Sequence, residues 1–286
     1  MFRNRIALAA LFILVAGLGG YAFWLEPSSL RLSRYDVAAP APLKGLTIAV
    51  IADLHGGSPY IDEAKIDRVV AMTNAAHPDL VLLTGDYGTG VDESLGGRRI
   101  PIKTIAAHLR PLRAPLGVYA VIGNHDRWEN EVRTVSAFRA AGIPVLENRH
   151  IAIARTDGPL YLAGIGDDKT HAADPVRALA GVPRTAPALC FTHSPDVFPA
   201  LPATCALTLA GHSHGGQVRL PLLGRPIVPS RFGQRYAAGL VREGGKSLFV
   251  STGIGTSHLA VRLGVPPEIS LLALKQGPIA ATRPLR

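Results

Sequence analysis

The sequence predicts an α/β protein with a sheet-rich second half, preceded by one N-terminal membrane-spanning helix. Three observations support this fold class. An uncharged apolar run opens the chain, apolar segments then alternate with helical patterns up to about residue 216, and short apolar segments separated by turns follow. The 286 residues are 48% hydrophobic and 18% charged, which provides a sizeable core and excludes a disordered chain.

The apolar run extends from Ile6 to Leu25 and is preceded by Arg3 and Arg5. A helix needs roughly 20 apolar residues to cross a bilayer. The run ends in bulky residues such as Trp24 rather than in a small-residue cleavage site, which favours an uncleaved signal anchor over a cleaved signal peptide. Because positive residues stay inside, we expect a single-pass protein of the inner, or cytoplasmic, membrane whose folded domain is extracytoplasmic.

Three segments are expected: residues 1–25 as the membrane anchor, 26–45 as a linker or first edge strand, and 46–286 as one globular catalytic domain. The net charge is +9. This charge suits an anionic lipid or a phosphorylated substrate, or it is only a solvated basic surface. Nucleic-acid binding is not expected, because the basic residues are scattered and no aromatic ladder accompanies them. The sequence does not predict an oligomeric state.

The expected elements of the domain follow in chain order. Apolar runs predict buried strands at 46–51, 80–84, 118–122, 160–165, 189–192 and 207–210, and late strands at 218–220, 248–251 and 269–274. Apolar residues at helical spacing predict helices over 61–76 and 128–141, and Gly142 and Pro144 end the second.

Polar residues able to bind metal or act in catalysis follow five of these strands directly. They are Asp53 and His55, Asp86, Asn124 with His125 and Asp126, His193, and His212 with His214. Since strand carboxyl ends in an α/β sheet converge on one edge, five segments deliver these side chains to one place. Asp, His and Asn without cysteine suit Zn, Mn or Fe. The donors suffice for two divalent metal ions about 3.5–4 Å apart, bridged by one carboxylate, which would hold a phosphate and generate hydroxide.

The order D-x-H, G-D, G-N-H-D, H and G-H-x-H resembles that of the calcineurin-like metallophosphoesterases. The resemblance extends from about Leu46 to Leu274 and is closest to the membrane-associated bacterial branch of YkuE- and YaeI-type phosphodiesterases. It implies a four-layer α/β/β/α sandwich, in which helices flank two mixed sheets. Many members carry a further Asp soon after the G-D segment, and no residue is assigned to that position here.

The resemblance also implies a role for each of the nine residues. Asp53, His55 and His214 would bind the first metal, Asn124, His193 and His212 the second, and Asp86 would bridge them. His125 would contact the phosphate and protonate the leaving group, with Asp126 orienting it. The implied reaction is direct attack of metal-bound hydroxide on a phosphomonoester, a phosphodiester or a pyrophosphate. A lipid-borne substrate near the anchor and a soluble phosphodiester are both open.

Two other functional interpretations compete with this one. The segment from Gly211 to Gly215 also matches G-x-S-x-G, the nucleophile elbow of serine hydrolases, but the residues after it are a poor helix start. A membrane-tethered binding module without catalysis would be expected to lack some of the ligands, and none is missing.

Four further residues receive no firm assignment. Cys190 and Cys205 are expected as small buried hydrophobes, and whether they pair is open. His258 and Arg262 lie in a late glycine-rich segment that borders the expected site, where either surface or substrate contact is possible.

Overall fold

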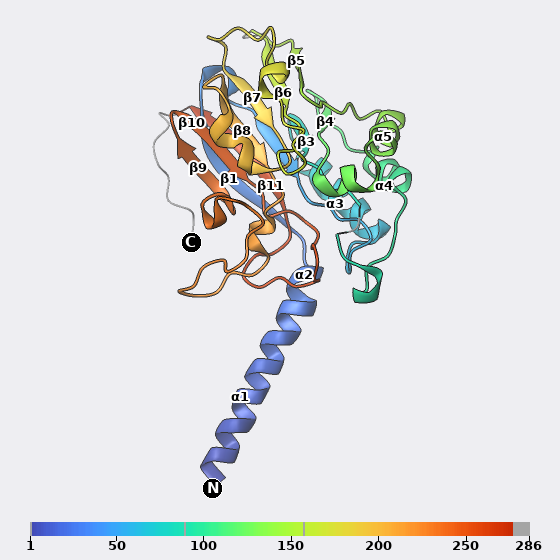
Figure 1. Cartoon of the computed structure of the whole chain (residues 1–286), viewed down its shortest axis with the longest axis vertical. Helices are drawn as coiled ribbons and strands as arrows, with labels where there is room; N and C mark the ends of the chain where they lie inside the picture. The colour runs from blue at the N-terminus through green and yellow to red at the C-terminus, as the bar shows by residue number, and fades with distance from the viewer. Residues whose placement is uncertain (1, 89, 157, 277–286) are drawn as a thin grey trace.

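Two mixed β-sheets packed face to face form the centre of the computed structural model, which describes residues 2–88, 90–156 and 158–276 (Figure 1). The first sheet holds, in spatial order, β1 (Arg31–Ala39), β11 (Glu268–Gln276), β2 (Thr47–Ile51), β3 (Leu80–Leu83) and β4 (Val118–Ala120). The second holds β5 (Arg149–Ile153), β6 (Leu160–Gly164), β7 (Ala188–Phe191), β8 (Cys205–Ala210), β10 (Lys246–Val250) and β9 (Gly239–Glu243). Strands β2 to β4 run parallel, as do β6, β7, β8 and β10, so each set has its carboxyl ends at one edge.

Helices and turns cover the outer faces of both sheets. On the first sheet lie α3 (Glu63–Ala75), α4 (Ile102–Leu109) and α5 (Asn124–Ala140), and on the second α6 (Pro175–Ala178) with the 3₁₀ turns η4 (Pro195–Ala200) and η6 (Gly233–Tyr236). Other short turns are η2 (Ala41–Leu43), η3 (Glu93–Leu95) and η5 (His214–Gly216). The predicted four-layer sandwich is confirmed. Its outer layer on the second sheet consists of short elements of four to six residues, and Pro199 inside η4 lacks the N–H that a longer helix would need there.

The central strands alternate between two cores. In β2, Ile48 and Val50 pack against the second sheet, whereas Ala49 and Ile51 pack against the helices. Burial on both faces requires apolar residues at every position, and this is why the sequence predicted these strands as continuous apolar runs.

Elements that the sequence did not predict firmly lie at the edges of the sheets. Strand β1 forms one edge of the first sheet, and β5 and β9 form the two edges of the second. Most residues of β5 and all of β9 are only partly buried, so they lack a continuous apolar signal. The expected strand 218–220 is wrong. Val218 and Leu220 form only isolated bridges, Val218 with Leu263 and Leu220 with the nearby Gly224. The chain turns at Pro221, which has no N–H to offer a strand.

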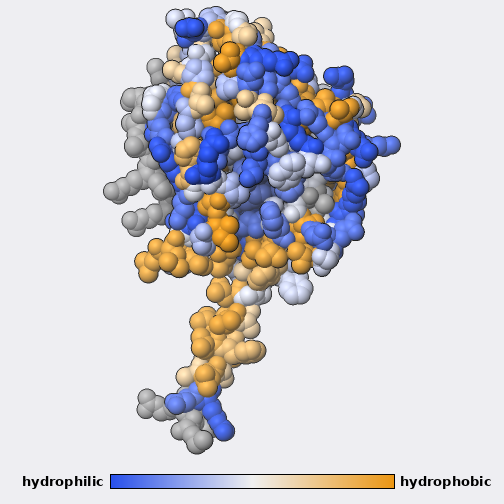
Figure 2. Space-filling model, in the orientation of Figure 1, coloured by the Kyte–Doolittle hydropathy of each residue, from blue (hydrophilic) through white to orange (hydrophobic). Residues whose placement is uncertain are grey.

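The N-terminal apolar helix stands away from the domain (Figure 1). It comprises α1 (Phe2–Gly20), the π-helical turn η1 (Tyr21–Leu25) and α2 (Glu26–Ser28). By length and composition, Asn4–Ser28 is able to cross a membrane, and its surface is apolar (Figure 2). Residues 26–45 form α2, β1 and η2, and residues 277–286 of the expected 46–286 domain lie outside the described range.

The end of this helix is hydrogen-bonded to the domain. The carboxylate of Glu26, only 3% exposed, accepts the backbone N–H groups of Gly264 and Val265. The carbonyl of Ala22 accepts the backbone N–H of Arg262 at 2.9 Å. The anchor is therefore fixed to the folded domain rather than connected to it by a flexible linker.

Cys190 of β7 and Cys205 of β8 form a disulfide, with their Cα atoms 5.5 Å apart. Both side chains are buried in the core outside the second sheet. The sequence left this pairing open, because only the adjacency of β7 and β8 brings the two thiols together.

Candidate metal centre

All nine residues predicted for the site lie together at the carboxyl ends of strands. Asp53 and His55 follow β2, Asp86 follows β3, Asn124, His125 and Asp126 follow β4, His193 follows β7, and His212 and His214 follow β8. Both sheets therefore contribute to one site. Eight of the nine are buried, and His125 is partly exposed.

The first group that could hold a metal ion consists of Asp53, His55 and His214, whose ligand atoms all lie within 4.8 Å of one another. Nε2 of His55 lies 3.1 Å from Nε2 of His214, which is 3.9 Å from Oδ1 of Asp53. This group crosses the interface between the sheets, because two of its members follow β2 and the third follows β8.

The second group consists of Asp86, His193 and His212. Nε2 of His193 is its centre, at 3.3 Å from Oδ2 of Asp86 and 3.1 Å from Nδ1 of His212. Oδ1 of Asn124 lies 3.0 Å from the same nitrogen, so the predicted amide ligand joins this group.

Asp86 lies between the two groups. Its Oδ2 is 3.3 Å from Nε2 of His193 and 3.7 Å from Nε2 of His55. Its Oδ1 accepts the backbone N–H of His125 at 2.9 Å, which fixes the carboxylate plane. A carboxylate held in this way is placed to bind a metal ion on either side.

The hydrogen bonds around the site leave ring nitrogens available as ligands. Nδ1 of His55 donates to the carbonyl of Gly88, and Nδ1 of His193 donates to that of Thr84. With the proton on Nδ1, the lone pair of each Nε2 faces the cluster. Nδ1 of His214 is buried without a hydrogen-bond partner among the described residues. Carboxylate, amide and imidazole acceptors that converge on one another require a cation between them, so these residues fit two divalent metal ions.

Burial controls the electrostatics of the site. It raises the pKa of Asp53 to about 7, offset in part by the charge of His193, and it lowers the pKa of His55 and of His212 to about 3. Burial also opposes charge on Asp86 and His193, but their mutual attraction outweighs it, lowering the pKa of the carboxyl and raising that of the imidazole. Buried carboxylates beside the neutral imidazoles of His55 and His212 favour a bound cation, because it offsets the cost of the buried negative charge.

The backbone is strained where the predicted ligands lie. Five of them have positive φ: Asp53, His55, Asp86, His212 and His214. Non-glycine residues adopt this conformation at a cost of order 1–3 kcal/mol each, and such strain concentrates at functional sites. Gly123 shows how closely the segments approach, because a Cβ there would lie 2.1 Å from Oδ1 of Asp86.

His125 occupies a different position from the buried ligands. Its ring meets that of His55 edge to face at 5.1 Å and that of Trp128 at 5.2 Å, and Trp128 is exposed. Burial lowers the pKa of His125, and the charge of Asp86 acts in the opposite direction. The imidazole is thus placed at the solvent side of the cluster, where a substrate would meet it.

Asp126 holds the backbone of the site. Its carboxylate accepts the N–H groups of Asp86, Tyr87 and Gly123, at 2.8 to 2.9 Å. No hydrogen bond joins it to the imidazole of His125 in the described structure. Asp126 therefore connects the loops after β3 and β4, and any effect that it has on His125 would pass through the backbone of these loops.

The late glycine-rich segment also meets the site. Arg262 is fully buried and donates to the carbonyls of Thr252, Gly255 and Val265, so it fixes loops and does not reach substrate. His258 is exposed, and its charge acts on His125, so His258 borders the open side of the cluster.

Asp167 was missed by the sequence reasoning. It is fully buried after β6, its charge acts on His193, and its Oδ1 has no hydrogen-bond partner among the described residues. The available signal was Gly166-Asp167 directly after an apolar run, which repeats the pattern of Gly85-Asp86.

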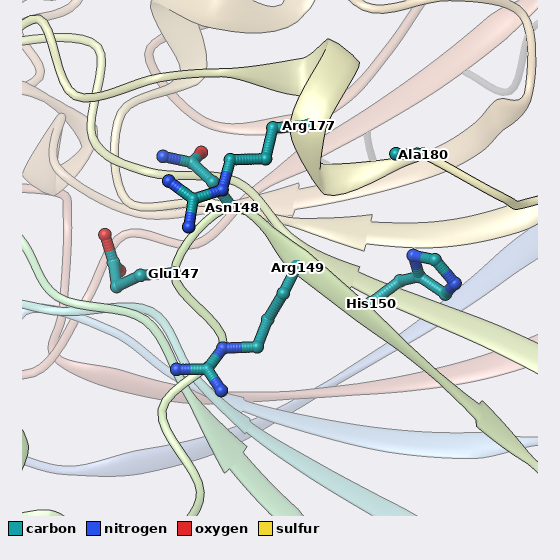
Figure 3. Close-up of a pocket in the computed structure, with 6 residues that line it drawn as sticks. All are labelled: Glu147, Asn148, Arg149, His150, Arg177 and Ala180. Carbon is teal, nitrogen blue, oxygen red and sulfur yellow. The ribbon is translucent and has the colours of Figure 1, made fainter.

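A pocket elsewhere has a volume of about 450 Å³ (Figure 3). Glu147, Asn148, Arg149, His150, Arg177 and Ala180 line it. None of the nine site residues belongs to it, so it is separate from the metal centre.

Comparisons with known proteins agree with this geometry. Residues 46–215 match a family model described as calcineurin-like phosphoesterase. The phosphodiesterase YaeI of Escherichia coli is 33% identical over 264 residues, which cover 89% of this chain and 92% of that protein. The metallophosphoesterase YkuE of Bacillus subtilis is 30% identical over 278 residues, 94% of each chain.

A third relative carries a substrate in its name. The UDP-2,3-diacylglucosamine pyrophosphatase LpxG of Chlamydia trachomatis is 26% identical over 308 residues, which cover 88% of this chain and 91% of that protein. Similarity to these proteins extends beyond the residues that the family model matches.

Proposed function

This chain belongs to the calcineurin-like phosphoesterase family, and on that premise we propose that it is a membrane-anchored, dimetal-dependent hydrolase of phosphodiester or pyrophosphate bonds. The observation that carries the proposal is the meeting of two ligand groups at Asp86. Asp53, His55 and His214 would hold one ion, Asn124, His193 and His212 the other, and Asp86 would serve both.

A dimetal centre supplies charge neutralisation for a bound phosphate and a nucleophilic water at neutral pH. The chain's own groups do the rest. The buried ligands exclude bulk water from the inner side of the cluster, and the carbonyls of Gly88 and Thr84 keep the histidine protons away from it. His125, on the solvent side, donates a proton to the leaving oxygen. Mn, Zn and Fe all suit this donor set.

Metal dependence tests the proposal directly. Removal of metal by a chelator is expected to abolish hydrolysis of bis-p-nitrophenyl phosphate, and Mn²⁺ is expected to restore it better than Mg²⁺, because imidazole ligands suit Mn²⁺ better. Full turnover by metal-free protein would refute the dimetal mechanism.

The same assay separates this mechanism from a serine hydrolase. The hydroxyl of Ser213 is fully buried and donates to the carbonyl of Ala237 at 2.6 Å, so it is not presented as a nucleophile. Ser213→Ala is therefore expected to retain most activity. Complete loss of turnover with metal still bound would favour the serine mechanism.

We place the catalytic domain outside the cytoplasmic membrane. Arg3 and Arg5 precede the span, and the disulfide between Cys190 and Cys205 supports this side, because disulfides persist in oxidising compartments. Protease added to spheroplasts is expected to digest the domain. Protection of the domain in intact spheroplasts, with digestion only after lysis, would place it in the cytoplasm.

The substrate class that we favour is a phosphodiester or pyrophosphate carried by a membrane lipid. The bonds from Ala22 and Glu26 to the domain keep the metal centre near the bilayer. The net charge of +9 adds attraction to anionic headgroups, at about 1 kcal/mol for each Lys or Arg near the surface. The name of the relative LpxG indicates a lipid-bearing pyrophosphate for that protein.

Vesicles distinguish this class from a soluble phosphodiester. Full-length protein in mixed vesicles is expected to cleave an embedded phospholipid or lipid pyrophosphate well above the background of Asp86→Ala. Hydrolysis confined to water-soluble diesters would rule out the lipid-borne class while leaving the phosphoesterase assignment intact.

A further inference from the structure

Four exposed aliphatic side chains lie on two loops near the end of the anchor. Leu222, Leu223, Ile227 and Leu259 are at least half exposed, and we call them the apolar rim. Figure 2 shows apolar side chains gathered at the base of the domain, beside the point where the helix leaves it. Large aliphatic groups that gather on a surface mark a contact with another apolar phase.

The tip of the first loop has two unfavourable features, an exposed apolar side chain and a strained backbone. Leu220 and Gly224 pair their backbones in both directions and close a hairpin, which leaves Leu222 at the tip. Leu222 is fully exposed and has a φ of +67°. No contact within the described domain offsets the exposed apolar surface or the strained backbone of Leu222, which indicates a role outside the domain.

A short path of hydrogen bonds connects the rim to the anchor. The backbone N–H of Arg219 donates to the carbonyl of Leu263 at 2.7 Å, and the N–H of Leu263 donates to the carbonyl of Gln217. The residues on either side of Leu263 bind the anchor, Arg262 through Ala22 and Gly264 through Glu26. The hairpin therefore keeps a fixed position beside the end of the helix.

The position of the helix sets the level of the bilayer. From Ile6 to Leu25 it is ~30 Å long, which matches the hydrocarbon thickness. Ala22 and Glu26, to which the domain binds, thus lie at the boundary between lipid and water. The exposed aromatic residues Phe23 and Trp24 suit that boundary.

The same loop connects directly to the metal centre. The loop begins at Gln217, three residues after His214. Nε of Arg225 in this loop donates back to the carbonyl of Gly215 at 2.8 Å. Further along, the backbone carbonyl of Pro229 accepts a hydrogen bond from the imidazole of His212. A loop that lies on the membrane would therefore hold the metal centre toward the lipid surface.

We propose that the apolar rim is a second membrane-contact surface, which inserts into the headgroup and acyl boundary of the leaflet from which α1 emerges. The inference rests on the proposed anchoring by α1 and makes no assumption about the substrate. Exposed Arg219, beside the hairpin, adds attraction to anionic headgroups. The helix, the hairpin and Leu259 then provide three points of contact, which fix the orientation of the domain on the membrane. With the helix alone, the domain would be free to rotate about the helix axis.

Fluorescence of full-length protein in vesicles of phosphatidylethanolamine and phosphatidylglycerol tests the proposal. Leu222→Cys or Ile227→Cys is labelled with the environment-sensitive dye NBD, since the two native cysteines are joined in a disulfide. Nitroxides on the lipid acyl chains are expected to quench the label at least about twofold, because interfacial apolar groups lie ~5–10 Å into the boundary. Emission is expected to shift to shorter wavelength.

Val176→Cys provides the matched control. Val176 is 84% exposed on α6, whose Ala178 carbonyl accepts a hydrogen bond from His150 of β5. Figure 1 shows β5 at the end of the domain opposite α1. The label there is expected to stay unquenched by lipid nitroxides and accessible to aqueous iodide.

Two results would overturn the proposal. One is equal quenching at residues 222 and 176. The other is a blue shift at 222 without lipid quenching, which would mean that protein, such as a second copy of the chain, covers the rim. Turnover of bis-p-nitrophenyl phosphate by the same samples separates the two hypotheses. Its absence in wild-type protein contradicts the proposed function, whereas unquenched labels on active protein contradict only the rim.

Discussion

The Asp86→Ala protein is expected to lose bound metal and phosphoesterase turnover together. Oδ2 of Asp86 lies within 3.7 Å of the nearest histidine nitrogen in each ligand group, so its removal weakens both groups at once. If the dimetal centre supplies about 4 kcal/mol of transition-state stabilisation, turnover falls about a thousandfold. Elemental analysis and hydrolysis of bis-p-nitrophenyl phosphate measure the two losses on one preparation.

Asp92→Ala is the matched control for this prediction. Asp92 follows in the same connection after β3, but its side chain is exposed and caps η3. It is expected to retain wild-type metal content and turnover. An Asp86→Ala protein that keeps two metal ions per chain would refute the bridging role of this carboxylate.

The His125→Ala protein is expected to keep both metal ions and lose turnover by about 10²–10⁴-fold, the usual contribution of a general acid. The imidazole is on the solvent side of the cluster and belongs to neither ligand group, so its removal leaves the ligand sets complete. The measurement pairs metal content with kcat on two diesters that differ in leaving group.

The leaving group reveals what His125 does. p-Nitrophenolate leaves without protonation, whereas an alkoxide requires a proton, so the loss is expected to be much smaller with the p-nitrophenyl ester. His258→Ala, which changes an exposed neighbour, is expected to show no such dependence. A His125→Ala protein with one metal site empty would contradict the assignment, since His125 would then be a ligand.

Strands buried on both faces were the easiest elements to predict. Strands β2, β3, β7 and β8 are apolar at nearly every position, with Thr47 and Thr208 as the exceptions, and this continuous pattern marks a strand buried on both faces. The start of α5 was predicted four residues late, because its first turn consists of site residues with no apolar period. Asn124 begins the helix because the carboxylate of Asp126 accepts the N–H of Gly123, a local contact. The same carboxylate also accepts the N–H of Asp86, 40 residues away in the sequence, so tertiary structure helps to fix this helix start.

The order of the polar segments was enough to predict the members of the site but not every neighbour. Asp167 follows its strand as Asp86 follows β3, yet only the packed structure places its carboxylate near His193. Arg262 was a candidate for substrate contact. Its burial against four backbone carbonyls instead gives it a structural role that its sequence neighbours do not reveal.

The sequence by itself determined the types of donor, their places at strand ends and the apolar span before the domain, because local composition and periodicity carry that information. The tertiary structure decided which donors share a group. Asp53 and His55 meet His214 only because the faces of β2 and β8 bury a common apolar core, and that packing depends on residues far apart in the chain. The same is true of the disulfide and of the bonds from Glu26 to the loop at Gly264, where no local pattern specifies the partner and burial of the surrounding apolar surface brings the groups together.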